Sequence, residues 1–354
     1  MVEHDKYILK CLNLAQLGLG KVAPNPMVAC VIVYDGEIIG EGYHHKFGEA
    51  HAEVNAINSV FNKGLLEKST LYVNLEPCSH FGKTPPCVDL ILKCKIPQII
   101  IGCVDPNSLV QGKGIERLIN AGCEVKLGIL EEECKEINKR FFTFHEKKRP
   151  FIILKWAQTK DGFIDSRRSK ETHLKSMKIS NETSQILVHQ WRSEEQAIMI
   201  GTNTAILDNS KLTTRLWKGK NPLRIVLDKD LRIPSNFNLF DDSAPTLIFT
   251  AISIKSQKKL EYVKIDFNKN VPEQVLNELY KREIQSIIVE GGEQLLSSFI
   301  QNHLWDEARV FVAEKEILHG VKAPDFIQNP LHEKNIDGDK LLTYRNQTVT
   351  LNKL

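Results

Sequence analysis

LEPCSHFGKTPPC, residues 75–87, is the stretch in which Cys78 and Cys87 each directly follow a proline. Proline holds φ at about −65° and donates no backbone hydrogen bond, so the stretch favours a shaped loop over a helix or a central strand. The preceding run TLYVNL, residues 70–75, predicts a strand that ends at this loop. A shaped loop that presents two thiols at the end of a strand is typical of a binding site.

A histidine and a glutamate upstream of the loop complete a metal-site pattern. His51-Ala52-Glu53 stands at the start of a predicted helix. One imidazole and two thiolates form a ligand set that suits zinc with a fourth position open for water. Glu53 lies two residues from His51, close enough to exchange a proton with that water without binding the metal. We therefore predict that His51, Cys78 and Cys87 hold zinc and that Glu53 is catalytic.

The order of these residues is that of the zinc deaminases, which carry H-x-E followed by P-C-x-x-C. One difference is that eight residues separate Cys78 from Cys87. The alternative interpretation is that His51 packs in a core and the cysteines are incidental. That alternative leaves the combination of ligand types and order unexplained.

Composition limits the class of protein. The 354 residues leave room for about two domains. A net charge of +3 argues against a dedicated nucleic-acid binder. The N-terminus lacks a signal-peptide pattern, and no apolar run reaches the roughly 18 residues of a membrane span. We expect a cytoplasmic protein without nucleic-acid or membrane partners, in which the other cysteines are small buried hydrophobic residues.

The first half alternates predicted strands and helices, which indicates a mostly parallel sheet with helices on its faces. Asp35-Gly36 joins two strands in a hairpin, because this pair fits a tight turn with positive φ. That hairpin is the one antiparallel pair that we expect. The expected strands are 28–34, 37–43, 70–75, 98–104 and 124–129, and the expected helices are 5–17, 51–61, 87–93, 114–122 and 131–144.

The charged string HEKKRP, residues 145–150, interrupts this pattern, and we place a domain boundary there, between residues 146 and 147. A second α/β series follows without any internal repeat. Its expected strands are 151–157, 197–201, 223–228, 246–250, 286–292 and 307–314, and its expected helices are 181–192, 272–282 and one after residue 292. The sequence thus predicts two α/β domains, 1–146 and 147–354.

Several motifs together resemble the bifunctional deaminase–reductases of riboflavin biosynthesis, a family in which the long cysteine spacing is usual. They are PNPMVACVIV (24–33), GEGYHHKFGEAHAEV (40–54), TLYVNLEPCSHFGKTPPC (70–87), DPNSLVQGKG (105–114), LKWAQTKDG (154–162), GTNTAILDNSKLTTR (201–215), PLRIVLD (222–228) and IIVEGG (287–292). The resemblance implies a cytidine-deaminase-like three-layer domain over 1–146 and a dihydrofolate-reductase-like domain over 147–354. It also implies zinc, NADPH and a homo-oligomer.

The activity implied by the resemblance has two steps. The first domain would deaminate 2,5-diamino-6-ribosylamino-4(3H)-pyrimidinone 5′-phosphate. The second would reduce the ribose with NADPH to give 5-amino-6-(5-phosphoribitylamino)uracil. Two alternatives stay open: a deaminase whose reductase-like domain only binds, and, less favoured, a nucleic-acid-editing deaminase, which would want a basic groove with stacking aromatic residues.

The resemblance also implies two sets of site residues. The cofactor would contact Ala157, Lys178, Thr204, Asp208, Lys229, Gly292, Glu293, Gln294, Leu295, Leu296, Ser297 and Ser298. The substrates would contact Asn25, His44, Lys155, Ser176, Arg192, Leu212, Arg215 and Glu290. Taken individually, Asn25 and Gly291-Gly292 also fit turns, and Arg192 also fits a solvated helix position.

The reductase half departs from the family at several positions. Lys178 stands where the family has a tryptophan against the nicotinamide, and Lys229 replaces a small polar residue. The segment 163–176 is longer than usual, and DNS replaces DDP at 208–210. The added lysines are compatible with pairing to cofactor phosphates and equally with a weakened reductase.

Overall fold

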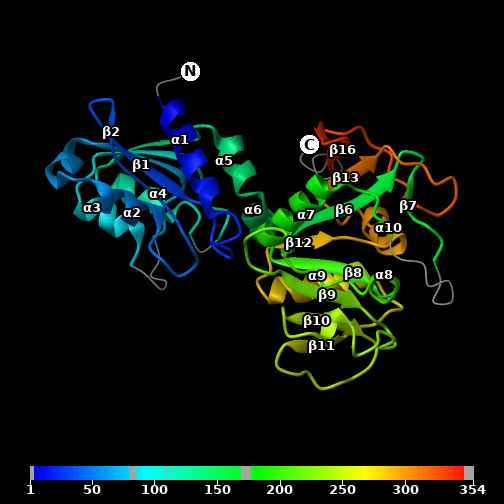
Figure 1. Cartoon of the computed structure of the whole chain (residues 1–354). Coiled ribbons are helices and arrows are strands. Elements are labelled where there is room, and N and C mark those ends of the chain that lie inside the picture. Colours follow the sequence, from blue (N-terminus) through cyan, green and yellow to red (C-terminus); the bar gives the residue numbers. More distant parts are fainter. Residues whose placement is uncertain (1–3, 80–84, 109, 169–176, 347–354) are drawn as a thin grey trace. The chain divides into compact units, whose positions relative to one another are not determined.

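The computed structural model describes residues 4–79, 85–108, 110–168 and 177–346 (Figure 1). The chain divides into two compact units, Met1–Lys148 and Arg149–Leu354. Each unit has a main sheet with helices packed on both faces. The α/β class predicted from the sequence is confirmed.

The first unit is built on five strands: β1 (Ala29–Tyr34), β2 (Glu37–Tyr43), β3 (Thr70–Leu75), β4 (Gln98–Cys103) and β5 (Glu124–Leu127). Their order in the sheet is β2-β1-β3-β4-β5. β1 is antiparallel to both β2 and β3, whereas β3, β4 and β5 are parallel. Our prediction of a single antiparallel pair was wrong, because β3 pairs with the edge of β1 that β2 leaves open, and this pairing is also antiparallel.

The predicted hairpin is confirmed, since Asp35 and Gly36 turn with φ of 51° and 78°. Alternate residues of β1 then face opposite layers: Val31 packs with α1, α5 and α6, and Ile32 packs with α2, α3 and α4. These helices are α1 (Asp5–Ala15), α2 (Ala52–Ser59), α3 (Cys87–Lys93), α4 (Lys113–Asn120), α5 (Glu131–Ile137) and α6 (Lys139–Lys147), beside the 3₁₀ helices η1 (Gln16–Gly18) and η2 (Lys63–Lys68). The result is a three-layer unit.

The region 131–144 forms two helices, not the single helix that its pattern predicts. The break falls at Asn138, which is buried. Its side chain accepts from the backbone N–H of Met27 at 2.7 Å and donates to the Met27 carbonyl at 3.0 Å. A contact across 111 residues therefore overrides the local helical pattern.

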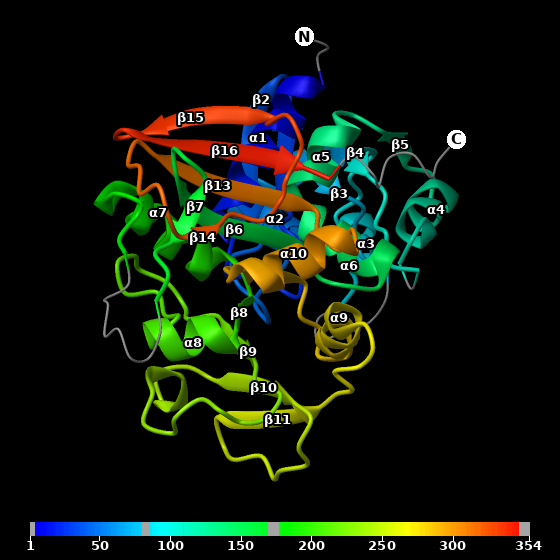
Figure 2. The ribbon, with the colours of Figure 1, turned by 90° about the vertical axis from the view of Figure 1, so that its right-hand side faces the viewer.

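The second unit has a nine-stranded sheet of order β11-β10-β9-β8-β12-β6-β13-β16-β15 and a small sheet of β14 and β7. The strands are β6 (Phe151–Thr159), β7 (Phe163–Asp165), β8 (Ala197–Gly201), β9 (Leu223–Leu227), β10 (Thr246–Thr250), β11 (Leu260–Lys264), β12 (Ser286–Val289), β13 (Glu307–Ala313), β14 (Val321–Lys322), β15 (His332–Ile336) and β16 (Asp339–Arg345). Pairing is parallel from β11 to β13 and antiparallel from β13 to β15. Figure 2 shows β15 and β16 as a hairpin beside β13.

Helices cover both faces of this sheet. They are α7 (Glu182–Glu194), α8 (Thr202–Asp208), α9 (Val271–Lys281) and α10 (Glu293–Gln301), with the 3₁₀ helix η3 (Asn238–Phe240). Residues of α9 and α10 pack on one face, and residues of α7 and α8 pack on the other. The sequence did not predict α8, β7, β11, β14 or β15, which are short or largely exposed. It also did not predict β16, whose buried residues include Leu341 and Tyr344. Among the described residues, no helix is long and apolar enough to cross a membrane.

Candidate functional site

Three elements of the first unit bring the predicted zinc ligands together. His51 is the residue that caps α2, and Cys87 is the first residue of α3. Cys78 lies in the loop that follows β3. The ligand atoms of these three residues all lie within 4.8 Å of one another. Cys78 thus lies at the start of the helix that carries Cys87, whose backbone N–H is 3.4 Å from the Cys78 sulfur.

The distances identify the atoms of His51, Cys78 and Cys87 that face one another. The thiol sulfurs of Cys78 and Cys87 lie 3.6 and 3.4 Å from His51 Nδ1. A hydrogen bond from the Cys87 thiol lowers the pKa of Cys78, so Cys78 is the thiol of the pair that ionises more readily. One imidazole nitrogen and two sulfurs at this spacing match the donor set of a zinc site that keeps one position open. The residues therefore fit a catalytic zinc ion.

Glu53 lies within the first turn of α2, next to this cluster, and is buried. Burial and the neighbouring Cys78 raise the pKa of its carboxyl group to about 6. A carboxyl group with a pKa near neutrality can both accept and return a proton. Its position and its chemistry fit a proton shuttle.

Asn25 and His44, the predicted pyrimidine contacts, lie against the cluster. His44 Nδ1 donates to the carbonyl of Ala50 at 3.0 Å, so its Nε2 accepts from the Asn25 side chain at 3.1 Å. The rings of His44 and His51 meet edge to face with centroids 5.5 Å apart. The backbone N–H of Asn25 also closes a turn onto Val22. Asn25 is thus both a turn residue and a partner of His44.

Sequence reasoning missed Glu76, the buried residue two positions before Cys78. Its Oε2 accepts from the backbone N–H groups of Asp105 and Gly112 at 3.2 and 3.0 Å. Its Oε1 accepts from those of Gly114 and Ile115 at 2.9 and 3.3 Å. Glu76 therefore holds the backbone of Asp105, Gly112, Gly114 and Ile115 next to the end of β3. A glutamate at a strand end next to a proline is the only local signal, and it does not reveal these partners.

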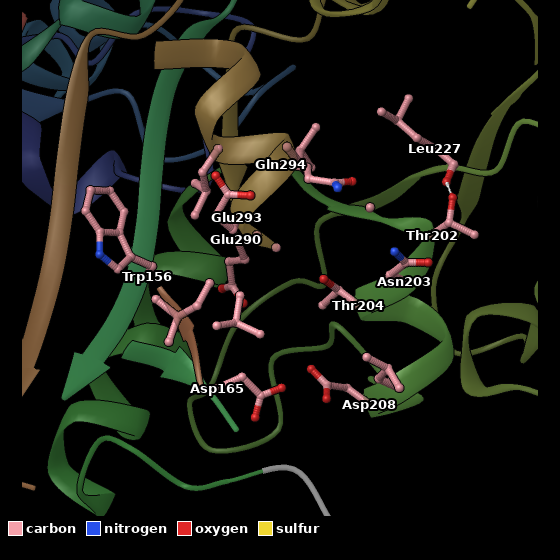
Figure 3. A pocket seen from close by; sticks show the side chains of 18 of the residues that line it. Trp156, Asp165, Thr202, Asn203, Thr204, Asp208, Leu227, Glu290, Glu293 and Gln294 are labelled. Carbon is pink, nitrogen blue, oxygen red and sulfur yellow. Dashed lines mark hydrogen bonds between the residues drawn. The ribbon is translucent and has the colours of Figure 1, made fainter. Parts of the chain in front are cut away.

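The second unit contains a cavity of about 910 Å³ between α8, α10, the middle of β6 and the ends of β9 and β12 (Figure 3). This volume is within the usual range for a small-molecule site. Of the predicted cofactor contacts, Ser297 is not among the lining residues, and its hydroxyl donates to Glu293 at 2.7 Å. Those that line the cavity are Ala157, Lys178, Thr204, Asp208, Lys229, Gly292, Glu293, Gln294, Leu295, Leu296 and Ser298.

Gly292 allows α8 and α10 to approach each other at this cavity. A Cβ atom at Gly292 would lie 3.2 Å from the hydroxyl of Thr204, which is a close contact. Gly292 caps α10, so Gly291-Gly292 leads directly into that helix. The glycine pair thus contributes to the cavity as well as to the connection between β12 and α10.

The predicted substrate residues Lys155 and Glu290 also line the cavity. Arg192 donates two hydrogen bonds to the Glu290 carboxylate, of 3.1 and 2.7 Å. Burial acts to raise the pKa of Glu290, but the charges of Arg192 and Lys155 overcome it and lower that pKa to about 2. Arg192 is itself buried, so the solvated-helix interpretation of this residue was wrong.

The remaining predicted substrate residues fall in three different situations. The backbone N–H of Arg215 donates to His189 at 3.1 Å. Burial, together with the charges of Arg192 and Arg215, lowers the pKa of His189. Leu212 is buried in the core beneath α7 and is not part of the cavity lining. Ser176 lies outside the described residues. Of the predicted cofactor contacts, Lys178 is exposed at the cavity edge, and Lys229 follows β9 by two residues.

Sequence reasoning also missed Asp165 and Arg168, which line the same cavity. Arg168 forms ion pairs with Asp165 and with Asp208, the latter at 2.6 Å. The charged run SRR at 166–168 was visible in the sequence, but its partner in α8 lies 40 residues away.

Comparison with known proteins finds relatives of both units. Residues 1–103 match the cytidine and deoxycytidylate deaminase zinc-binding region, and residues 150–349 match the RibD C-terminal domain. The riboflavin biosynthesis protein RibD of Aquifex aeolicus is 39% identical over 333 residues, which cover 91% of this chain and 90% of that protein. RibD of Escherichia coli is 33% identical over 335 residues, which cover 89% and 88%.

Solved structures give the same result over the whole chain. A diaminohydroxyphosphoribosylaminopyrimidine deaminase/5-amino-6-(5-phosphoribosylamino)uracil reductase of Thermotoga maritima is 36% identical with a TM-score of 0.87, covering 97% of this chain and 99% of that chain. RibD of Acinetobacter baumannii is 29% identical with a TM-score of 0.86, covering 97% and 98%. Because the matches extend over both units and include the zinc-binding region, this chain belongs to the RibD family of bifunctional deaminase–reductases of riboflavin biosynthesis.

Proposed function

We propose that the chain deaminates 2,5-diamino-6-ribosylamino-4(3H)-pyrimidinone 5′-phosphate and then reduces the product with NADPH to 5-amino-6-(5-phosphoribitylamino)uracil. The observation that carries the proposal is the cluster of His51, Cys78 and Cys87 beside buried Glu53, on a chain whose second unit holds the cavity described above. Residues 1–146 would carry the first step and residues 147–354 the second. A homo-oligomer remains a prediction from the resemblance, and a cytoplasmic location remains a prediction from the sequence pattern.

In the deaminase site, His51, Cys78 and Cys87 would hold the metal. Zinc, when bound, supplies the Lewis acidity that makes a water molecule nucleophilic near neutral pH. Glu53 would accept a proton from that water and return it to the departing amine. Asn25 and His44 would orient the pyrimidine ring of the substrate, since their mutual hydrogen bond fixes both side chains next to His51.

In the reductase site, the start of α10 and Thr204 would bind NADPH, because both line the cavity and Gly292 leaves room for close approach. NADPH supplies the reducing equivalent. Arg215 would meet the substrate phosphate, since a guanidinium can fork to its oxygens. Lys155, which lines the cavity, would face the substrate. Arg192 would act by holding Glu290 ionised toward the substrate.

Product analysis tests the proposal directly. With the diamino-pyrimidinone phosphate alone, the chain should release ammonia and accumulate the deaminated intermediate. With NADPH added, it should oxidise the cofactor and form the ribityl product. Ammonia release without NADPH oxidation would instead support the alternative in which the second domain only binds.

Metal analysis tests the zinc assignment separately. The purified protein should hold one zinc ion per chain at the ligand set described above. Cys78→Ser and Cys87→Ser should each lower zinc content and abolish deamination. Cys94→Ser is the matched control, because Cys94 is also partly buried but lies outside the cluster. Deamination by a zinc-free protein would contradict the assignment.

A further inference from the structure

A single arginine ties the segment after β7 to the helix α8. The Arg168 Nε donates to Asp165 Oδ2 at 2.8 Å, and its Nη2 donates to Asp208 Oδ1 at 2.6 Å. Its Nη1 donates to the carbonyl of Leu207 at 3.2 Å. The Arg168 side chain is only 5% exposed. One guanidinium therefore joins a strand end, a loop and the end of a helix.

The two acids that Arg168 joins face the cavity. Asp165 and Asp208 both belong to its lining, and Figure 3 shows their carboxylates pointing toward each other. Burial raises the pKa of Asp208, and Arg168 opposes that change while Asp165 adds to it. Without Arg168, the cavity wall would present two adjacent carboxylates that repel each other and any anion bound there.

We propose that Arg168 is a positioning residue for NADPH, which acts by fixing Asp208 and by cancelling the negative charge of the cavity wall. The inference rests on the proposed reductase function, because it requires NADPH in this cavity. NADPH carries several phosphate charges, so the carboxylates would oppose its binding if they were unpaired. Removal of the guanidinium should therefore weaken cofactor binding more than it slows the chemical step.

The test is steady-state reduction by the full-length, zinc-loaded protein, with the deaminated intermediate and varied NADPH. Arg168→Ala should raise the NADPH KM about tenfold, equivalent to about 1.4 kcal/mol, with kcat changed by less than about twofold. The rise should shrink as salt increases, since salt screens charge repulsion. Ammonia release should stay unchanged.

Three further variants separate charge from packing. Asp165→Asn in the Arg168→Ala background should recover part of the lost NADPH affinity, because it removes one of the two opposed charges. Arg168→Lys should give an intermediate KM, since an ammonium cannot fork to both acids. Arg282→Ala is the matched control: Arg282 donates to Glu278 and Glu261, both at 2.8 Å, but lies outside the cavity lining.

An NADPH KM within about twofold of the unaltered protein in folded Arg168→Ala, at low salt, would overturn the inference. So would a loss of kcat and thermal stability in Arg168→Ala and Arg168→Lys that Asp165→Asn does not relieve, because that result describes a purely structural arginine. If the unaltered chain fails to oxidise NADPH, the proposed reductase function itself is overturned, and the inference falls with it.

Discussion

Replacement of Glu76 by glutamine should destabilise the first unit strongly, although the two side chains have nearly the same shape. Each carboxylate oxygen of Glu76 accepts from two backbone N–H groups, at distances between 2.9 and 3.3 Å. Glutamine offers one oxygen and one NH₂ group, so in either orientation two backbone N–H groups face a donor. One member of each pair is buried: Asp105 in the Oε2 pair and Gly114 in the Oε1 pair.

The expected cost follows from these lost acceptors. An unsatisfied buried donor costs about 1–3 kcal/mol, which gives about 2–6 kcal/mol for two. Gly112 and Ile115 are half-buried, so water can replace part of the loss. We therefore expect the free energy of unfolding to fall by about 2–4 kcal/mol. That leaves a protein of ordinary stability, at about 5–15 kcal/mol, still folded.

Urea denaturation can measure this change because the two units carry different probes. All four tryptophans, Trp156, Trp191, Trp217 and Trp305, lie in the second unit. Tryptophan fluorescence therefore follows the second unit, while circular dichroism follows both. At a slope of about 2 kcal/mol per molar urea, the midpoint of the first unit should fall by about 1–2 M. Zinc should be held constant, because a metal that binds the folded state adds stability.

The matched control is Glu116→Gln, which changes an exposed glutamate on α4 beside the same segment. It should change stability by less than about 0.5 kcal/mol, as surface substitutions usually do. The tryptophan transition should stay in place in both variants. If Glu76→Gln behaved like Glu116→Gln, then the four backbone contacts would contribute little and the reasoning would be wrong.

Three other predictions concern catalysis, the cofactor and pH. Glu53→Gln should keep its zinc and lose about 10²–10⁴-fold in deamination rate, because the amide cannot shuttle a proton; loss of zinc instead would make Glu53 a ligand. Lys178→Glu should raise the NADPH KM at low salt by up to about fivefold, since exposed ion pairs contribute about 0–1 kcal/mol, while Lys178→Trp should preserve activity; an unchanged KM in Lys178→Glu would place Lys178 away from the cofactor. Burial, with the charges of Arg192 and Arg215, lowers the pKa of His189 to about 4. The unfolded chain then binds the proton first, so the stability of the second unit should fall from about pH 6.5 toward pH 4. Tryptophan-monitored urea midpoints should show a shallower fall in His189→Asn, and equal slopes would refute this linkage.

Local signals in the sequence were sufficient for many elements. Asp35-Gly36 predicted its hairpin, and the strand 70–75 and the helix 87–93 have the predicted bounds. The candidate zinc ligands could be proposed from the sequence because each residue type carries its own chemistry, and their order matches a known pattern. The structure confirms that His51, Cys78 and Cys87 meet.

Contacts between distant residues decided the rest. Glu76 bonds to backbone groups 29 to 39 residues away, and Arg168 reaches Asp208 across 40. Asn138 ends a helix because it binds Met27, not because of its neighbours in sequence. A periodic pattern reports which face of an element is apolar, and a motif reports which ligand types are present. A single buried hydrogen bond or ion pair has neither a period nor a fixed spacing, so only the folded chain shows which partner it has.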